Sequence, residues 1–213
     1  MTNIGASSFR NCTSLTSIEI PNSVTRIGSS AFEGCSGLIS VAVPNSVARI
    51  EDGAFFGTPW YNNQSDGVVY INDVLYNYKG TMPSGTSVEI IEGTVSISPN
   101  EFQDCSNLVS VTIPNSFTSI EEYAFDGCSG LTSVVIPNSV TNIGHFAFRN
   151  CSVLASVAIS SNVKSIGDGV FRGCASLTSV TIPDSVTYIG YGAFDGCSGL
   201  SSLTIGNSVT SIG

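Results

Sequence analysis

Residues 131–153 read Leu131-Thr-Ser-Val-Val-Ile-Pro-Asn-Ser-Val-Thr-Asn-Ile-Gly-His-Phe-Ala-Phe-Arg-Asn-Cys-Ser-Val153, and residues 177–199 read Leu177-Thr-Ser-Val-Thr-Ile-Pro-Asp-Ser-Val-Thr-Tyr-Ile-Gly-Tyr-Gly-Ala-Phe-Asp-Gly-Cys-Ser-Gly199. The two segments agree at most positions, so they are copies of one unit. Eight units start at steps of 23 residues, apart from one step of 47, at positions 15, 38, 85, 108, 131, 154, 177 and 200. Such a period indicates a repeat protein in which each unit forms one coil. We expect one domain, residues 1–213, with a partial unit at 1–14.

Within each unit, apolar residues alternate with small polar ones just before a proline. A period of two is typical of a strand with one buried face, so we expect Val180 and Ile182 to point inward. Ser179 and Thr181 then point outward. Pro183 has no N–H and ends this strand. A second short extended piece and an inward Ala-Phe pair complete the unit.

One coil cannot bury its own apolar face, so neighbouring coils must stack and share a core. The phenylalanines of this core are Phe9, Phe32, Phe55, Phe102, Phe125, Phe148, Phe171 and Phe194. The cysteines follow the same period and are Cys12, Cys35, Cys105, Cys128, Cys151, Cys174 and Cys197. A file of thiols does not converge on one point as metal ligands must. We interpret them as inert core thiols and expect no metal and no cofactor.

The charge of the chain excludes several classes of partner. The net charge is −9, with only seven lysines and arginines, which disfavours nucleic acid and anionic lipid as ligands. No run of 18 apolar residues occurs, so we expect no direct membrane insertion. The first residues show neither the basic start nor the apolar run of a signal peptide.

The sequence offers no catalytic set. The single histidine, His145, falls at a variable turn position, where a surface role is the simplest interpretation. The abundant serines belong to the repeat and lack an accompanying base and orienting acid. No phosphate-binding loop and no zinc-protease motif is present. We therefore expect a protein that is not an enzyme.

Residues 61–84 interrupt the period, and two apolar runs flank Asn72-Asp73, which predicts a β-hairpin. Insertions in repeat proteins often map to a binding face. We therefore count the aromatic side chains of this segment as candidate ligand-binding residues: Trp60, Tyr61, Tyr70, Tyr76 and Tyr78. The alternative is that these aromatics attach the hairpin to the solenoid, and we favour it because an isolated hairpin is marginally stable.

The outward positions of the first strand form two rows along the stack. One row is uniformly serine, from Ser17 to Ser202, and carries no information that specifies a ligand. The second row varies, and its candidate ligand-binding members are Glu19, Glu89, Thr112, Val135, Thr181 and Thr204. Neither row contains the aromatic or arginine side chains that dominate strong interfaces.

The recurring pattern Leu-Thr-Ser-Val-x-Ile-Pro-Asn-Ser-Val-Thr-x-Ile-Gly-x-x-Ala-Phe-x-Gly-Cys covers almost the whole chain and resembles the BspA-type, or Treponema-type, leucine-rich repeat. The resemblance implies an α/β-type repeat solenoid that is mostly β. This solenoid is right-handed, with a parallel concave sheet, short convex strands and turns, and one β-hairpin insertion. The resemblance also implies an extracellular or cell-surface protein of a bacterium or a parasitic protist that acts in adhesion or protein binding.

Two hypotheses about function follow. The favoured one is a non-catalytic binding module of an adhesin-like protein, whose partner is a protein of a host or neighbouring cell surface, or a glycan. The alternative is a structural stalk or spacer that presents other domains of a larger chain. Both ends of the sequence fall within a unit and show no capping segment, which solenoids normally need. We therefore expect a fragment of a larger protein, or end-to-end self-association.

Overall fold

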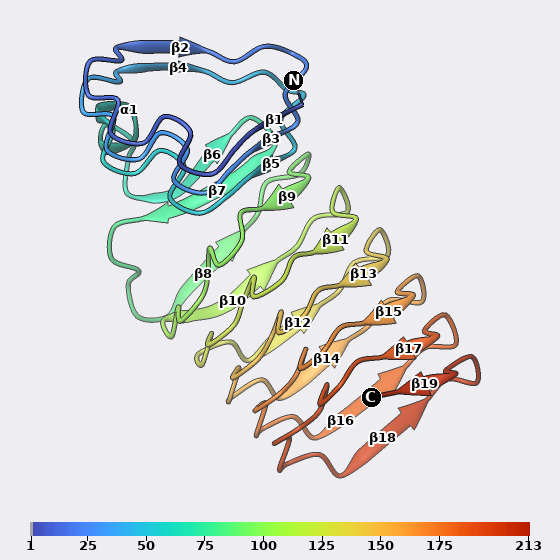
Figure 1. Cartoon of the computed structure of the whole chain (residues 1–213). Coiled ribbons are helices and arrows are strands. Elements are labelled where there is room, and N and C mark those ends of the chain that lie inside the picture. Colours follow the sequence, from blue (N-terminus) through green and yellow to red (C-terminus); the bar gives the residue numbers. More distant parts are fainter. Residues whose placement is uncertain (1) are drawn as a thin grey trace. The chain divides into compact units, whose positions relative to one another are not determined.

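The computed structural model describes residues 2–213 and consists of short β-strands joined by tight turns (Figure 1). Within that range there are nineteen strands and one four-residue helix. The strand pairings are parallel except for that of one hairpin. The predicted mostly-β solenoid of stacked parallel strands is therefore confirmed.

The chain divides into two compact units. Unit 1 comprises the residues up to Thr81 together with Ser96–Pro99, and unit 2 comprises Met82–Val95 and Asn100–Gly213. The sequence-based expectation of one domain over residues 1–213 is not tested by this division and stays a prediction.

Unit 2 is a stack of coils whose strands form two parallel sheets (Figure 1). The strands of the larger sheet are β8 (Thr86–Glu89), β10 (Leu108–Thr112), β12 (Ser133–Val135), β14 (Ser156–Ala158), β16 (Ser179–Ile182) and β18 (Ser202–Ile205). The strands of the smaller sheet are β11 (Ser119–Ile120), β13 (Asn142–Ile143), β15 (Ser165–Ile166), β17 (Tyr188–Ile189) and β19 (Ser211–Ile212). In both sheets, each strand other than the two at the edges lies between its equivalents from the preceding and following coils.

The strand register follows the sequence period. Ser179 pairs with Ser202, its equivalent in the next coil. In β16, Val180 and Ile182 are buried while Ser179 and Thr181 are exposed, as the alternation predicts. The strand ends at Ile182, directly before the proline of the unit. This register places equivalent side chains of successive coils above one another.

Stacked phenyl rings fill the core of unit 2. The centroids of neighbouring rings are 5.3 to 5.8 Å apart along the row Phe102, Phe125, Phe148, Phe171 and Phe194. The ring planes are within 18° of parallel, which is the offset-stacked arrangement that aromatic pairs prefer. The interior rings are fully buried, whereas Phe194 in the last complete coil is partly exposed.

The cysteines have a hydrogen-bonding role in addition to packing. Five of them donate their S–H to the carbonyl oxygen of a phenylalanine in the preceding coil, at 2.9 to 3.2 Å. These donors are Cys35, Cys128, Cys151, Cys174 and Cys197. A small apolar side chain with one donor satisfies both the core and the turn carbonyl at this position.

Burial keeps the thiols inside the stack of coils protonated. It raises the pKa of Cys105 to about 11 and that of Cys174 to about 12, and it raises the pKa of Cys151 well above the ordinary value. The interpretation as inert core thiols therefore applies to the interior of the stack. Cys12 departs from it, because its side chain is exposed in the first turn of unit 1.

Unit 1 contains three further sheets. A parallel sheet consists of β1 (Asn3–Ile4), β3 (Arg26–Ile27) and β5 (Arg49–Ile50). A second parallel pair consists of β2 (Ser17–Glu19) and β4 (Ser40–Ala42). The third sheet consists of β6 (Gly67–Ile71), β7 (Val74–Lys79) and β9 (Ser96–Ile97). Phe9, Phe32 and Phe55 stack in the core of unit 1, and Phe9 at the end of the row is 40% exposed.

The predicted hairpin at Asn72-Asp73 is confirmed, with β6 and β7 antiparallel and Asn72 at a φ of 50°. A short helix that the sequence analysis did not predict, α1 (Pro59–Asn62), precedes it. Thr58 caps this helix by accepting a hydrogen bond from the N–H of Tyr61, and Pro59 occupies a position where no donor is needed.

The hairpin serves as an irregular coil of the stack. Strand β7 runs parallel to β9, with Leu75 opposite Ile97. The N–H of Ser98 donates to the carbonyl of Leu75 at 2.9 Å, as the N–H of Glu51 donates to that of Ile27 between regular coils. Leu75 therefore takes the place of the isoleucine in the second strand of a unit.

Candidate functional site

The varied outward row lies on the larger sheet of unit 2, and we call its six members the outer row. These are Glu89, Thr112, Val135, Ala158, Thr181 and Thr204, all of which are exposed. Glu89 lies opposite Thr112, and Thr181 lies opposite Thr204. In unit 1 the equivalent position is Glu19, which is exposed and lies opposite Ala42. The predicted candidates of this row thus share one sheet face within each unit.

The uniform serine row runs beside the outer row. Its members pair across strands, as Ser110 does with Ser133, and the Oγ of Ser110 donates to the Oγ of Ser87 at 2.8 Å. Hydroxyl groups that bond to one another across strands stabilise the sheet. The serine row thus has a structural explanation that requires no ligand.

A hollow of about 390 Å³ opens on this sheet between β10 and β12. Thr112 and Val135 of the outer row line it, together with Asn115, Pro137 and Asn138. The register of β10 and β12 joins Ser110 with Ser133 and does not extend to Thr112 and Val135 among the described residues. The hollow therefore opens where two neighbouring strands stop pairing, and Val135 at its edge is 67% exposed.

The coil of β10 differs from those that follow it at one core position. Phe117 is buried where the three following coils carry Val140, Val163 and Val186. The hydroxyl of Ser139 in the next coil is buried and has no hydrogen-bond partner among residues 2–213.

The equivalent serines elsewhere in unit 2 show what Ser139 has lost. Ser185 Oγ donates to the carbonyl of Val163 at 2.7 Å, and Ser116 Oγ donates to the carbonyl of Thr94. Each of these bonds joins a coil to its predecessor. Sequence reasoning missed the hollow, because the repeat pattern does not show where two neighbouring strands stop pairing.

Tyr76, a candidate from the hairpin, lies inside unit 1 and is 1% exposed. Its ring meets those of Phe55, Phe56 and Tyr61 edge-on at 5.8 to 6.4 Å. Its hydroxyl accepts a hydrogen bond from the N–H of Phe55 at 2.9 Å. In a regular coil that N–H reaches a backbone carbonyl, as the N–H of Phe32 reaches Ala54. The side chain of Tyr76 therefore replaces part of a coil, and we do not include it in a binding surface.

The other aromatic candidates, in helix α1 and in the hairpin, are half-buried. Trp60 packs against Phe55 with ring centroids 5.2 Å apart, and Tyr61 packs against Phe56 at 5.0 Å. Tyr61 also hydrogen-bonds Asn77 through its hydroxyl. These contacts attach the irregular coil to the core of unit 1. Tyr70 and Tyr78 are likewise partly exposed, and a ligand-binding role for these four aromatics stays a prediction.

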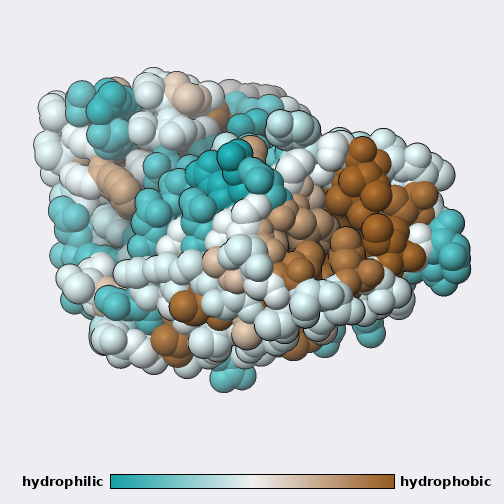
Figure 2. All heavy atoms as spheres, turned by 90° about the horizontal axis from the view of Figure 1, so that it is seen from below, coloured by the Kyte–Doolittle hydropathy of each residue, from teal (hydrophilic) through white to brown (hydrophobic). Residues whose placement is uncertain are grey.

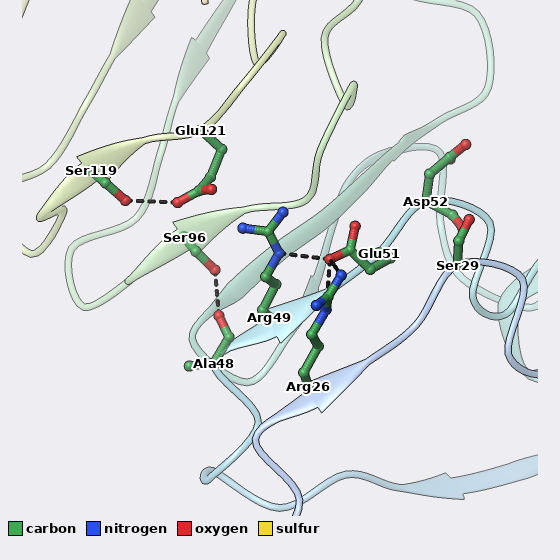
Figure 3. A network of polar contacts seen from close by, with 9 residues as sticks. All are labelled: Arg26, Ser29, Ala48, Arg49, Glu51, Asp52, Ser96, Ser119 and Glu121. Atoms are coloured by element: carbon green, nitrogen blue, oxygen red, sulfur yellow. Dashed lines mark hydrogen bonds and ion pairs between the residues drawn. The ribbon is translucent and has the colours of Figure 1, made fainter. Parts of the chain in front are cut away.

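The arginines of the chain are held by its own carboxylates. In unit 1, Arg26 and Arg49 converge on Glu51 at 2.9 and 2.6 Å (Figure 3). Arg10 pairs with Glu33 at 2.8 Å, and hydrogen bonds from Ser30 and Arg10 lower the pKa of Glu33. In unit 2, the partners are Asp126 for Arg149 and Asp195 for Arg172. Within residues 2–213 every arginine thus has a carboxylate partner, and none is left unpaired to contact a phosphate.

Two absences concern residues 2–213. No group of three or more metal-ligating side chains comes together there. No helix within that range is long and apolar enough to cross a membrane.

The last coil of unit 2 leaves apolar side chains exposed. Leu203 and Ile205 in β18 are each 41% exposed, and Ile212 in β19 is 60% exposed. These strands lie at the bottom of Figure 1, and the view from below in Figure 2 shows an apolar area in brown. End-to-end self-association stays a prediction.

Comparison with known proteins identifies the repeat. The sequence model described as the BspA type leucine rich repeat region matches residues 1–80 and 85–213 in six copies. No curated protein matches the chain.

Several solved structures are similar to the chain. A leucine-rich repeat protein from Eubacterium ventriosum is 20% identical with a TM-score of 0.55, over 100% of this chain and 76% of that one, and it shares the fold. A leucine-rich repeat protein of T. pallidum is 28% identical with a TM-score of 0.42, over 93% and 71%. A protein from Faecalibacterium prausnitzii that is described as a leucine rich cell surface protein is 26% identical with a TM-score of 0.45, over 94% of this chain. The chain spans 62% of that protein's length, which is less than two thirds.

Proposed function

The chain belongs to the BspA-type leucine-rich repeat family, and from this premise we propose that it is a non-catalytic module that binds another protein. We place this function at the cell surface or outside the cell, as the family resemblance implies. The binding surface is the outer row on the larger sheet of unit 2, centred on the hollow between β10 and β12.

The hollow is the single observation that carries this proposal. It is the place where two outer-row candidates, Thr112 and Val135, stand at the edge of a concave space instead of on a flat sheet. The apolar side chains of Val135 and Pro137 receive an apolar group, while Asn115 and Asn138 offer amide donors and acceptors around it. This combination suits a protruding apolar side chain of a partner together with the peptide groups beside it.

The electrostatics support a protein partner over a nucleic acid. Every arginine is paired with a carboxylate, and the outer row itself contains one charged residue, Glu89. Interfaces between proteins are depleted in charge at their centres, whereas nucleic-acid interfaces are strongly basic.

The test compares two variants of the outer row. Binding is screened against a panel of extracellular proteins and a glycan array, and affinity for any partner is then measured by calorimetry. Val135→Lys fills the hollow with a charged chain, and we expect at least a tenfold loss of affinity. Thr204→Lys changes the charge equally on the same face, three strands away, and we expect less than a twofold change.

Equal losses of affinity in the two variants would contradict a binding site at the hollow. Failure of the wild-type chain to bind any protein, alongside glycan binding, would redirect the proposal to a carbohydrate ligand. Failure to bind anything would favour the spacer hypothesis.

A further inference from the structure

The charge of the molecule is concentrated in unit 2. That unit carries ten aspartates and glutamates against three lysines and arginines, a net of −7, whereas unit 1 carries six against four, a net of −2. Two of the three cations of unit 2, Arg149 and Arg172, are already paired with carboxylates. The surface of unit 2 is therefore complementary to a basic partner.

Two exposed aromatic side chains of unit 2 lie close together, one in strand β17 and one in the turn that follows it. Tyr191 is 75% exposed and Tyr188 is 41% exposed. The carboxylate of Asp168 in the preceding coil connects them, because its Oδ1 accepts the N–H of Tyr191 at 2.8 Å and lies 3.5 Å from the hydroxyl of Tyr188. Its Oδ2 lies 3.4 Å from Nδ1 of His145. We call Tyr188, Tyr191 and Asp168 the tyrosine–aspartate patch.

The same unit shows what such a combination binds. Arg149 donates two hydrogen bonds to the buried carboxylate of Asp126, at 2.9 and 2.6 Å. Its guanidinium carbon lies 5.4 Å from the ring centroid of Tyr123 and 5.0 Å from that of Phe146. Asp126 and Tyr123 belong to one coil, and Phe146 and Arg149 to the next. Two aromatic rings and a carboxylate from neighbouring coils thus hold one guanidinium group.

The tyrosine–aspartate patch has the rings and the carboxylate but receives no cation from the chain. Arg172, the equivalent of Arg149 one coil later, pairs with Asp195 at 3.1 Å instead. Within residues 2–213, neither Tyr188 nor Tyr191 has a lysine or arginine over its ring. The two ring systems differ in geometry as well as in occupancy. Tyr123 and Phe146 stack at 5.2 Å from neighbouring coils and hold Arg149, whereas Tyr188 and Tyr191 come from one coil and are open to solvent.

We propose that the tyrosine–aspartate patch binds a lysine or arginine side chain in a basic segment of a partner protein. The cation lies over the ring of Tyr191 and pairs with Asp168, as Arg149 does with its own rings and carboxylate. This inference deepens the proposed function, since it names the chemistry of a partner segment, but it uses residues that the outer-row variants leave unchanged.

The experiment titrates the whole chain with a hexa-arginine peptide at low ionic strength, followed by calorimetry. We expect the wild type to bind, and both Asp168→Asn and Tyr191→Ala to bind at least fivefold more weakly. Tyr191→Phe keeps the aromatic face and should stay within twofold of the wild type. Glu122→Gln removes the same charge from an exposed acid elsewhere on the turns of unit 2 and should also stay within twofold.

Two results would overturn the proposal. One is an equal weakening in Asp168→Asn and Glu122→Gln, because the attraction would then be diffuse and follow net charge alone. The other is an absence of peptide binding by the wild type. Because Val135→Lys leaves the patch intact, it should still bind hexa-arginine, so failure of the hollow and failure of the patch give different results.

Discussion

The regular coils of unit 2 and the irregular coil of unit 1 fill the core and pair the buried backbone with different residues. A regular coil fills the core with a phenyl ring stacked on both neighbours and satisfies each phenylalanine N–H with a carbonyl of the next coil, as Phe148 does with Val170. The irregular coil, residues 59–80, has neither group. It uses the ring of Tyr76 edge-on and the hydroxyl of the same side chain as the acceptor.

The difference shows that what is required at each level of the stack is apolar volume and a paired backbone, and that the exact motif is one of several ways to supply them. A regular coil distributes these tasks over many residues and backbone groups. The irregular coil concentrates them on one tyrosine. Stability should therefore respond to side-chain volume in unit 2 and to a single hydroxyl in unit 1.

The largest expected effect comes from removing a ring from the middle of the regular stack. Phe148→Ala deletes a fully buried ring that stacks on both sides and should lower the free energy of unfolding by about 3–5 kcal/mol in denaturant titrations. Phe194→Ala is the control, because its ring is partly exposed and should cost less. Equal costs at the two positions would contradict a shared interior.

A smaller effect is expected from the hydroxyl of Tyr76. Tyr76→Phe keeps the ring but leaves the buried N–H of Phe55 without this acceptor, which should cost about 1–3 kcal/mol of unfolding free energy. The matched control is Tyr191→Phe, which removes a hydroxyl from a side chain that is 75% exposed and should leave stability unchanged. A neutral Tyr76→Phe would mean that the hydroxyl is dispensable.

The buried thiols should make unit 2 sensitive to alkali. The pKa of Cys174 is raised to about 12 by burial, from an ordinary value of 9.0, so the unfolded chain loses this proton first as pH rises. The buried, protonated thiol contributes fully to the free energy of unfolding below pH 9. Above that pH its contribution is lost progressively toward the folded pKa, at about 1.4 kcal/mol per pH unit. In Cys174→Ala, the unfolding free energy should fall less steeply between pH 9 and 11 than in the wild type. The two slopes should agree between pH 6 and 8, and agreement at all pH values would refute the assignment.

Much of this architecture is predictable from the sequence. The period fixes which residues stack, the alternation in Ser179–Ile182 gives the buried face, and the apolar runs around Asn72-Asp73 give the hairpin. Helix α1 also had a signal that went unused, namely Thr58 as a cap with Pro59 at the first helical position.

The remaining features depend on contacts between coils, which a single unit does not reveal. The role of Tyr76 depends on an N–H that lies 21 residues away in the chain. The hollow depends on how far the pairing of β10 with β12 extends, and the tyrosine–aspartate patch depends on which side chains of neighbouring coils meet. Tyr188 and Tyr191 occupy variable positions, where the repeat pattern gives no information about partners.

The most direct test of the shared interior is alkylation of the native chain with iodoacetamide, followed by peptide mapping of each thiol over time. We expect Cys12 to be modified rapidly and Cys105 and Cys197 to follow slowly. Cys128, Cys151 and Cys174 should react only after denaturant is added. If Cys151 in the native chain were modified as fast as Cys12, this would contradict a stack of coils whose thiols line its buried core.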